Sequence, residues 1–404
     1  MPDRLLIHLK YCLTPLHRVT NAAIVIREGR ILAVGGFSAF TETSAYELVD
    51  LPDCYALPGF IDTRLYGAGG FDCMHADTDR NIAGMSKILA CHGVTSFLPT
   101  TQSHEPQRLR TVVGALAEQC HEDLPGATPV AVHIEGPFIN PRRSGAHPRQ
   151  YIRGIDLDET RALIAAGAGR IAVFTFAPEL PLALELTTLL REHHIIPCLG
   201  HTLAEEPDVR AAIAAGATRC SHLYNGMEPL LNRKLGLAAI ALIDERLWVE
   251  FIADGVHCHP GMIDLACRCK PKDRLVGISN SMEAAGLASG IYRMGADEVL
   301  VTAEKATLAD GTIAGSVSFL DDNYRRLLAL SHLDRGDAAA CFSLNAARSI
   351  GLDDRGEIKP GKRADLVVLD EKHEVVLTLV GGRIVYRRDA KPPAPTASPT
   401  ALPA

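Results

Sequence analysis

Polar side chains that can do chemistry follow several apolar segments in the middle of the chain. Most of them are carboxylates and imidazoles, which transfer protons and bind metal ions. In chain order these residues are Asp62, Glu135, His201, His222, His257 and Asn280. Each comes at the end of a short apolar run, so a fold that gathers the ends of these runs would place them in one site.

The apolar runs alternate with segments of helical periodicity that end in glycine, such as 159–169 and 204–217. We expect strands at 55–61, 96–98, 129–134, 171–174, 196–199, 219–222, 248–252 and 275–278. About eight strand–helix units over about 290 residues predict a (β/α)8 barrel, an α/β fold with its catalytic groups at the carboxyl ends of the strands. A doubly wound sheet is the alternative, but no GxGxxG sequence follows the first strand.

The two ends of the chain read as short strands joined by turns. Residues 1–56 contain a hairpin signal at Glu28–Gly29–Arg30, and residues 351–390 contain a second strand-rich segment with Gly381–Gly382. Neither segment is long enough to bury a core of its own. We therefore expect both ends to form one small β-sandwich domain, with the barrel (57–350) between them. A Pro- and Ala-rich tail, 391–404, is expected to be disordered.

Composition and charge narrow the possible partners. The 404 residues include 41 Lys and Arg against 48 Asp and Glu, a net charge of −7. No basic field is available for nucleic acid or an anionic membrane, so an anionic substrate needs local cations. The eleven cysteines are scattered and odd in number, and no apolar run reaches the roughly 20 residues that cross a bilayer. We expect a reduced, cytoplasmic protein.

Taken in order, these segments resemble the N-acetylglucosamine-6-phosphate deacetylase family of the amidohydrolase superfamily. The motifs are PGFID at 58–62, HIEGPF at 133–138, GHT at 200–202, SHLYNGM at 221–227, ADGVH at 253–257, GTIAGS at 311–316 and PGKRADL at 360–366. The resemblance implies a barrel of the amidohydrolase type. It also implies a zinc-dependent enzyme that removes acetate from an N-acetylated amino-sugar phosphate, with N-acetylglucosamine 6-phosphate as the expected substrate.

The resemblance implies one Zn²⁺ per subunit, or another divalent ion, on Glu135, His201 and His222. One carboxylate and two imidazoles form a ligand set that leaves a position open for water. Zinc lowers the pKa of such a water toward about 7 and polarises the amide carbonyl. A lone histidine is more often packed or solvated than a ligand, but three such residues at strand ends favour a metal site.

The resemblance also assigns residues to the substrate. Asn225, the backbone at Gly226, Arg233 and His257 would hold the phosphate and the sugar, and His147 would contact the sugar. A guanidinium fork and an imidazole suit an anionic phosphate. Taken alone, Arg233 would be a solvated loop cation. In the family this arginine comes from the neighbouring subunit, which implies a homodimer.

Arg64 and Tyr66 depart from the family pattern. Many amidohydrolases have His-x-His at these positions as ligands of a second metal, and some deacetylases of the family have Gln-x-Asn and use one metal. Arginine is permanently charged and cannot be a ligand, so we predict a single ion. Two interpretations of Arg64 stay open: a structural ion pair with Glu135 or Asp62, or contact with an anionic ligand.

Asn280 is the second departure, because the family has an aspartate there as general acid and base. An amide cannot carry a proton, and loss of acid–base catalysis costs about 10²–10⁴-fold in rate. Three explanations stay open: an engineered inactivating substitution, natural silencing, or a natural change of chemistry. Two alternative functions follow: a non-hydrolytic sugar-phosphate-binding homologue, or an amidohydrolase for another anionic amide with Arg64 setting specificity.

Overall fold

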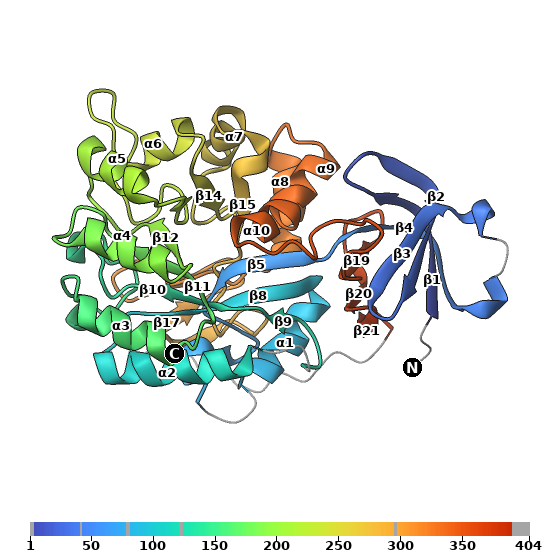
Figure 1. The fold of residues 1–404 in the computed structure, drawn as a ribbon, viewed down its shortest axis with the longest axis horizontal. Coiled ribbons are helices and arrows are strands. Elements are labelled where there is room, and N and C mark those ends of the chain that lie inside the picture. Colours follow the sequence, from blue (N-terminus) through green and yellow to red (C-terminus); the bar gives the residue numbers. More distant parts are fainter. Residues whose placement is uncertain (1–3, 41–42, 78–80, 121–123, 295–296, 390–404) are drawn as a thin grey trace.

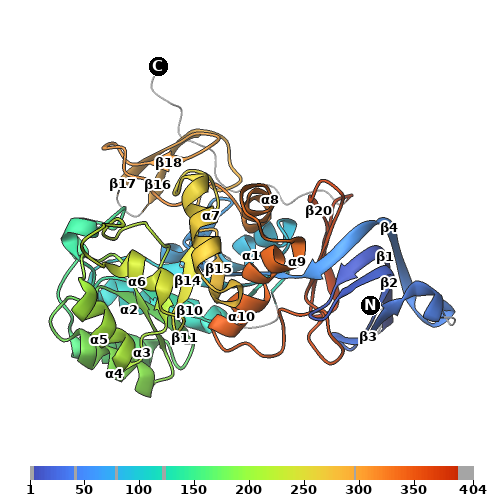
Figure 2. The same ribbon diagram turned by 90° about the horizontal axis from the view of Figure 1, so that it is seen from above.

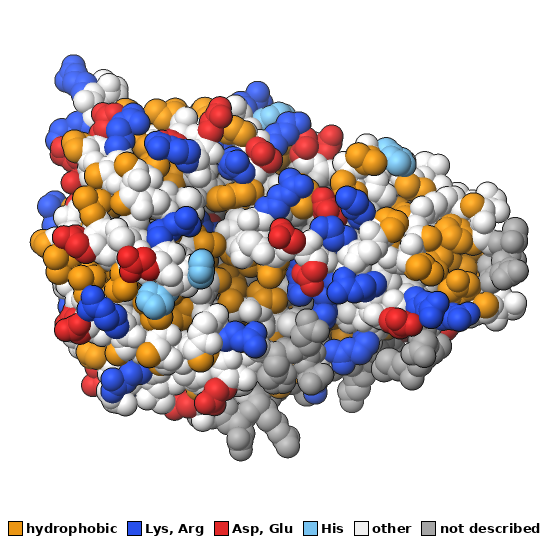
Figure 3. Space-filling view, viewed as in Figure 1, with side chains coloured by type: hydrophobic (Ala, Val, Ile, Leu, Met, Phe, Trp, Pro, Cys, Tyr) orange, Lys and Arg blue, Asp and Glu red, His pale blue; other side chains and the backbone are white. Residues whose placement is uncertain are grey.

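The computed structural model describes residues 4–40, 43–77, 81–120, 124–294 and 297–389, and the expected disordered tail at 391–404 lies outside this part of the chain. A barrel of strands ringed by helices makes up the larger body, and a sheet built from both chain ends lies beside it (Figure 1). Charged side chains of both signs are interspersed over the face shown in Figure 3. Within the described residues, no helix is long and apolar enough to cross a membrane.

The barrel has eight strands, each parallel to its neighbours, in chain order around the sheet. They are β5 (Phe60–Leu65), β8 (Val94–Thr101), β10 (Val132–Glu135), β11 (Ile171–Phe176), β12 (Ile196–Leu199), β13 (Arg219–Cys220), β14 (Trp248–Phe251) and β15 (Leu275–Gly277). A short strand, β9 (Thr128–Pro129), pairs with β8. The N–H of Asn280 donates to the Arg64 carbonyl at 3.1 Å, which brings the end of the last strand beside the first. The predicted (β/α)8 barrel is confirmed.

Amphipathic helices cover the outside of the barrel (Figure 1). In α5, for example, Val209, Ala212 and Ile213 are buried at the spacing of one helical face, and the helix ends at Gly216 with a φ of 114°. The helices are α1 (Asn81–Cys91), α2 (Pro106–Gln119), α3 (Leu157–Ala166), α4 (Ala183–Glu192), α5 (Glu206–Ala215), α6 (Leu237–Ile243), α7 (Pro260–Cys269), α8 (Leu320–Leu330), α9 (Arg335–Cys341) and α10 (Leu344–Ser349).

The small domain is one mixed sheet with the strand order β21-β20-β19-β4-β1-β2-β3. These strands are β1 (Arg4–Leu13), β2 (Arg18–Arg27), β3 (Arg30–Gly36), β4 (Glu47–Pro58), β19 (Leu366–Leu369), β20 (Val375–Val380) and β21 (Arg383–Arg387). β19 pairs antiparallel with β4, with Leu366 opposite Pro58, so the two chain ends share one sheet and one apolar core. The predicted β domain from both ends is confirmed, and its seven strands form a single sheet.

The expected strand at 55–61 is two strands in the structure. β4 ends at Pro58 in the small domain and β5 begins at Phe60 in the barrel. Between them, Gly59 passes so close to Thr95 that a Cβ atom would lie 2.2 Å from the threonine Cγ2. Only glycine fits there. Because the apolar run is continuous in sequence, periodicity alone could not separate the strands.

A three-stranded antiparallel sheet lies to one side of the barrel strands (Figure 2). It consists of β16 (Gly290–Met294), β17 (Asp297–Val301) and β18 (Ala306–Thr307). Its buried face packs on Tyr66 and Met282. Since Met294 and the following Thr312 and Ile313 also line the cavity at the barrel mouth, this sheet supplies one wall of the site. A two-stranded ribbon, β6 (Gly67–Ala68) with β7 (Phe71–Asp72), follows the first barrel strand.

Candidate active site

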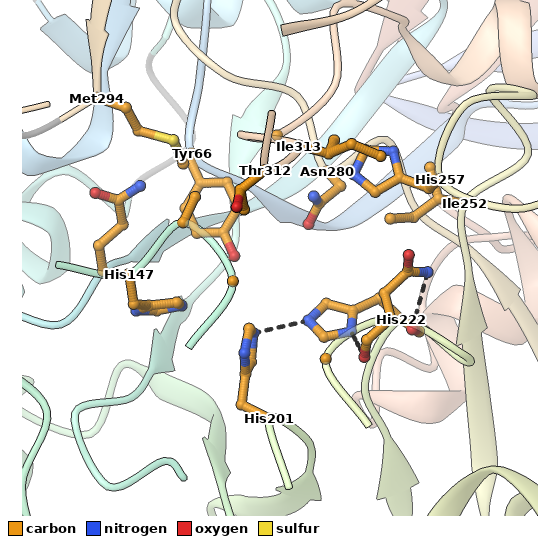
Figure 4. A pocket seen from close by; sticks show the side chains of 16 residues that line it. Tyr66, His147, His201, His222, Ile252, His257, Asn280, Met294, Thr312 and Ile313 are labelled. Atoms are coloured by element: carbon orange, nitrogen blue, oxygen red, sulfur yellow. Dashed lines mark hydrogen bonds between the residues drawn. The ribbon is translucent and has the colours of Figure 1, made fainter. Parts of the chain in front are cut away.

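A cavity of about 200 Å³ opens at the carboxyl ends of the barrel strands (Figure 4). The predicted site residues that line it are Tyr66, His147, His201, His222, Asn225, Gly226, His257 and Asn280. Glu135 and Arg64 are fully buried beside it. Arg233 is exposed on the segment between β13 and α6 and does not line the cavity of its own chain. The structure thus brings together all the predicted site residues except Arg233.

Glu135, His201 and His222 converge on one point. The Nε2 atoms of the two histidines are 3.1 Å apart, and they lie 3.3 Å and 3.2 Å from Oε1 of Glu135. The imidazole planes are nearly perpendicular, at 89°, so the two nitrogens approach that point from different directions. Glu135 is the last residue of β10, and the histidines follow β12 and β13, so the ends of three barrel strands position the group.

Backbone carbonyls set the protonation of both histidines. Nδ1 of His201 lies 2.7 Å from the carbonyl oxygen of Arg143, and Nδ1 of His222 lies 3.1 Å from that of Asn225. A carbonyl only accepts, so each Nδ1 carries the proton and each Nε2 presents a lone pair. Burial lowers the pKa of His222 to about 4, which keeps this imidazole neutral near pH 7.

Nε2 of His201, Nε2 of His222 and Oε1 of Glu135 are all hydrogen-bond acceptors, and neither imidazole has a proton between these atoms. A cation bound between the three atoms would remove their mutual repulsion. Ligand atoms about 2.0–2.1 Å from a tetrahedral zinc lie about 3.3–3.4 Å apart, which matches the observed separations of 3.1–3.3 Å. The donor set therefore fits a single divalent ion.

His147 is a further imidazole near the group: ligand atoms of Glu135, His147 and His201 lie within 4.8 Å of one another. The backbone N–H of Ser103 donates to Nδ1 of His147 at 3.1 Å. Nδ1 is therefore the acceptor, and the proton of the neutral ring sits on Nε2, which lies 3.7 Å from Oε2 of Glu135. His147 thus offers the cavity an N–H donor, and His222 is the better third ligand.

Arg64 and Tyr66 both donate to the carboxylate of Glu135. Nη1 of Arg64 donates to Oε1, and the Tyr66 hydroxyl donates to Oε2. Burial by itself would raise the pKa of Glu135, but the Arg64 guanidinium holds it well below its usual range. Glu135 is therefore an anion in the site.

Arg64 belongs to a buried ion network. Its Nε donates to Oε2 of Glu250 at 2.8 Å, and Nε of Arg219 donates to Oε1 of Glu250 at 2.6 Å. The contact with Asp62 is only a backbone N–H to Oδ1, at 3.3 Å. Arg64 does not line the cavity, so the structure selects the ion pair with Glu135 and contradicts contact with an anionic ligand.

His257 is held by a second carboxylate. Nδ1 of His257 lies 2.7 Å from Oδ2 of Asp254, and the Ser316 hydroxyl donates to the same oxygen at 2.8 Å. Burial would raise the pKa of Asp254, but hydrogen bonds from His257 and from backbone N–H groups hold it far below its usual range. The Asp254 carboxylate therefore fixes the proton of His257 on Nδ1, which leaves Nε2 for a ligand in the cavity.

Comparison with known proteins places this chain in a family. Residues 55–385 match the model of the amidohydrolase family. The N-acetylglucosamine-6-phosphate deacetylase of Bacillus subtilis (strain 168) is 35% identical over 390 residues, which cover 96% of this chain and 98% of that protein. The chain belongs to the N-acetylglucosamine-6-phosphate deacetylase family. This finding confirms the resemblance noted in the sequence.

Other deacetylases are similar over most of the chain. The N-acetylgalactosamine-6-phosphate deacetylase of Escherichia coli O157:H7 is 35% identical over 328 residues, covering 81% of this chain and 86% of that protein. An aspartate-to-alanine mutant of the Mycobacterium smegmatis N-acetyl-D-glucosamine-6-phosphate deacetylase has been solved in complex with N-acetyl-D-glucosamine-6-phosphate. That structure is 32% identical with a TM-score of 0.89, and the match covers 95% of this chain and 99% of that chain.

Asn280 stands at the edge of this deacetylase-family cavity. Its φ is 55°, a left-handed conformation that asparagine and aspartate tolerate better than most residues. Its Oδ1 atom is buried and has no hydrogen-bond partner among the described residues. The backbone is anchored, because Asn280 donates to the Arg64 carbonyl and accepts from the N–H of Ser316 at 2.8 Å. The side chain is held at the cavity with an unpaired oxygen.

Sequence reasoning missed two buried charges of the deacetylase-family site, Glu250 and Arg219. Both are fully buried, and Glu250 also accepts from the backbone N–H of His222 at 3.3 Å. A signal was present, since Glu250 is a charged residue inside a short apolar strand and Arg219 begins another short buried strand. Such residues are rarely buried unless they are paired, so their positions alone pointed to an internal ion network.

Proposed function

We propose that this chain is a zinc-dependent deacetylase of N-acetylated amino-sugar 6-phosphates, with N-acetylglucosamine 6-phosphate as its substrate. One Zn²⁺ would be held by Glu135, His201 and His222, and it would supply an activated water and polarise the amide carbonyl. The observation that carries the proposal is the convergence of their ligand atoms within 3.3 Å at the barrel mouth of a deacetylase-family chain.

His147 and His257 would both bind the substrate through Nε2, because a protein group occupies Nδ1 of each ring. The protonated Nε2 of His147 is a donor for an oxygen of the substrate, since Ser103 occupies Nδ1. His257 is oriented by Asp254 through Nδ1, which leaves Nε2 for the substrate in the cavity. Asn225 and the backbone at Gly226 lie on the same cavity wall and complete the sugar-phosphate site.

A phosphate in this cavity needs a stronger cation than imidazole. Among the described residues that line it, none is a lysine or an arginine. Arg233 is exposed, and no hydrogen bond or ion pair holds its side chain within the part of its own chain that the structure describes. We therefore propose a homodimer in which Arg233 of the partner subunit completes the phosphate site, as an arginine fork suits a phosphate.

Asn280 is at the position that would carry the proton between the water and the leaving amine. The Asn280 amide cannot accept this proton from the water or donate it to the amine, so we expect the chain to be a slow deacetylase. The same residue favours the second candidate, a homologue that binds the sugar phosphate without hydrolysing it. The third candidate is an amidohydrolase that acts on another anionic amide and uses Arg64 to select it. Nothing supports this candidate over the others, because Arg64 is buried outside the cavity.

Acetate release tests the proposal. The zinc-loaded chain and its Asn280→Asp variant are each given N-acetylglucosamine 6-phosphate, N-acetylgalactosamine 6-phosphate and unphosphorylated N-acetylglucosamine. We expect the variant to be faster with the phosphorylated sugars by about 10²–10⁴-fold. Calorimetry tests the second candidate. Tight binding of the sugar phosphate with no turnover by either protein would show that the chain binds the sugar phosphate without being a deacetylase.

A further inference from the structure

Four fully buried ionised side chains lie behind the proposed ion site. Arg64 contacts both Glu135 and Glu250, and Arg219 contacts Glu250. All four side chains have no solvent exposure. The two guanidinium and two carboxylate charges cancel, so the carboxylate that would bind the ion belongs to a network that is already neutral. Buried ions are stable only when paired in this way.

We infer that Arg64 sets the affinity of the Glu135, His201 and His222 group for a divalent ion, weakening it by opposing the charge of the ion. This inference rests on the ion site of the proposed function. Arg64 donates to Oε1 of Glu135, the same oxygen that faces both histidines. An ion bound at that oxygen would lie within a few ångströms of a second, permanent positive charge, in an interior where such charges interact strongly.

Charge, and not ligand orientation, is the main contribution of Arg64. Backbone carbonyls orient His201 and His222 without help from Arg64. The Tyr66 hydroxyl holds the other carboxylate oxygen of Glu135. The ligand geometry therefore has supports that remain when the guanidinium is removed. What disappears is one unit of positive charge, and the remaining buried network then carries a net charge of −1.

A weakened ion affinity means that the ion can leave and rebind while the chain stays folded. Because Arg64 already pairs with Glu135, the folded chain does not need an ion to neutralise that carboxylate. We expect a chelator to remove the ion without unfolding the protein. In a variant without the guanidinium, the ion takes over that task, so ion binding and folding stability become linked.

Zinc affinity, measured by competition with a chromogenic chelator, tests the inference with the substrate absent. Arg64→Gln is expected to bind zinc about 10- to 100-fold more tightly than the unaltered chain, the scale on which partners of metal ligands act. Arg64→Lys keeps the charge and should stay within about threefold. Arg246→Gln removes an exposed guanidinium that pairs with Asp244 and serves as the control, with unchanged affinity.

A second variant gives the opposite sign. Glu250→Gln leaves Arg64 and Glu135 in place but makes the buried network net positive, so zinc binding should weaken. This measurement decides the matter if Arg64→Gln does not fold. Equal or weaker zinc binding by Arg64→Gln, or unchanged binding by Glu250→Gln, overturns the inference while leaving the proposed function intact. Absence of zinc binding in the unaltered chain and every variant overturns both.

Discussion

The Nε2 atoms of His201 and His222 lie 3.1 Å apart, and both nitrogens present lone pairs because the opposite nitrogen of each ring faces a backbone carbonyl. Two lone pairs at this distance repel each other unless a cation lies between them. This relationship, with Oε1 of Glu135 as the third corner, is the structural basis of the proposed activity.

Removing one ligand should abolish ion binding without unfolding the chain. Mutating a residue that only supports a metal ligand lowers metal affinity by up to about 100-fold. Because His222 would itself be a ligand, we expect His222→Ala to lower zinc affinity by more than that. The carbonyl of Asn225 loses its donor, but it lies beside the cavity, where water can replace it. Equilibrium dialysis measures the affinity, and circular dichroism checks the fold. His257→Ala, a cavity residue outside the ligand set, should keep its zinc.

A carboxylate at position 280 should enable proton transfer. Asn280→Asp places an ionisable oxygen at the atom that is now buried and unpaired. We expect kcat for N-acetylglucosamine 6-phosphate to rise by about 10²–10⁴-fold, with a smaller change in KM. Asn280→Ser, which cannot ionise, should leave kcat low. Equal rates for the aspartate and serine variants would show that position 280 does not transfer the proton.

The Asp254 carboxylate should matter through His257. Asp254→Asn removes the carboxylate that accepts from Nδ1 of His257 and orients its ring, so binding of the phosphate should weaken. In the Asn280→Asp background we expect KM to rise at least about tenfold with kcat less affected. Ser316→Ala removes only the hydroxyl that supports Asp254 and should have a smaller effect. A larger loss in kcat than in KM would contradict the binding role.

Arg233 should act across a dimer. Arg233→Ala is an exposed change that should leave the fold and zinc binding unaltered while raising KM for the phosphorylated sugar. In the Asn280→Asp background, dimers mixed from Arg233→Ala and His222→Ala chains contain one complete site. Random pairing should recover about a quarter of the activity. No recovery after mixing, with dimers verified by light scattering, would place Arg233 outside the partner's site.

Asp62 should make stability depend on pH. Burial raises the pKa of Asp62 from 3.8 to about 7, so between these values the folded chain holds a proton that the unfolded chain has lost. Stability from this group is full below about pH 4 and is lost as the pH rises through 7, at up to about 1.4 kcal/mol per pH unit.

The comparison variant for Asp62 is Asp62→Asn, which stays neutral at every pH. Urea unfolding of both proteins at pH 5, 6 and 7 gives the difference in free energy of unfolding. We expect the variant to gain relative to the unaltered chain as the pH rises. A difference that does not change with pH would mean that Asp62 is ionised in the folded chain.

The order of the barrel strands and the residues at their ends could be predicted from the sequence, because parallel strands leave apolar runs that end in polar residues. Glu135, His201 and His222 were found in this way. The break at Gly59 could not be found, since it depends on the close approach of Thr95 from a neighbouring strand. Local periodicity contains no information on such contacts between distant segments.

The direction of the Arg64 side chain also could not be predicted from the sequence. Its position at the end of the first barrel strand allowed either the cavity or the interior. What decides is the presence of two carboxylates, Glu135 and Glu250, inside the barrel. Arg219 shares the second of them, so the choice depends on four residues brought together by three-dimensional packing.

The most direct test of the account is anomalous diffraction at the zinc absorption edge from crystals of the zinc-loaded chain. The account predicts one strong peak per subunit at the barrel mouth, about 2.0–2.2 Å from Nε2 of His201, Nε2 of His222 and Oε1 of Glu135. A peak at any other group of residues, or none at this site after loading, would contradict it.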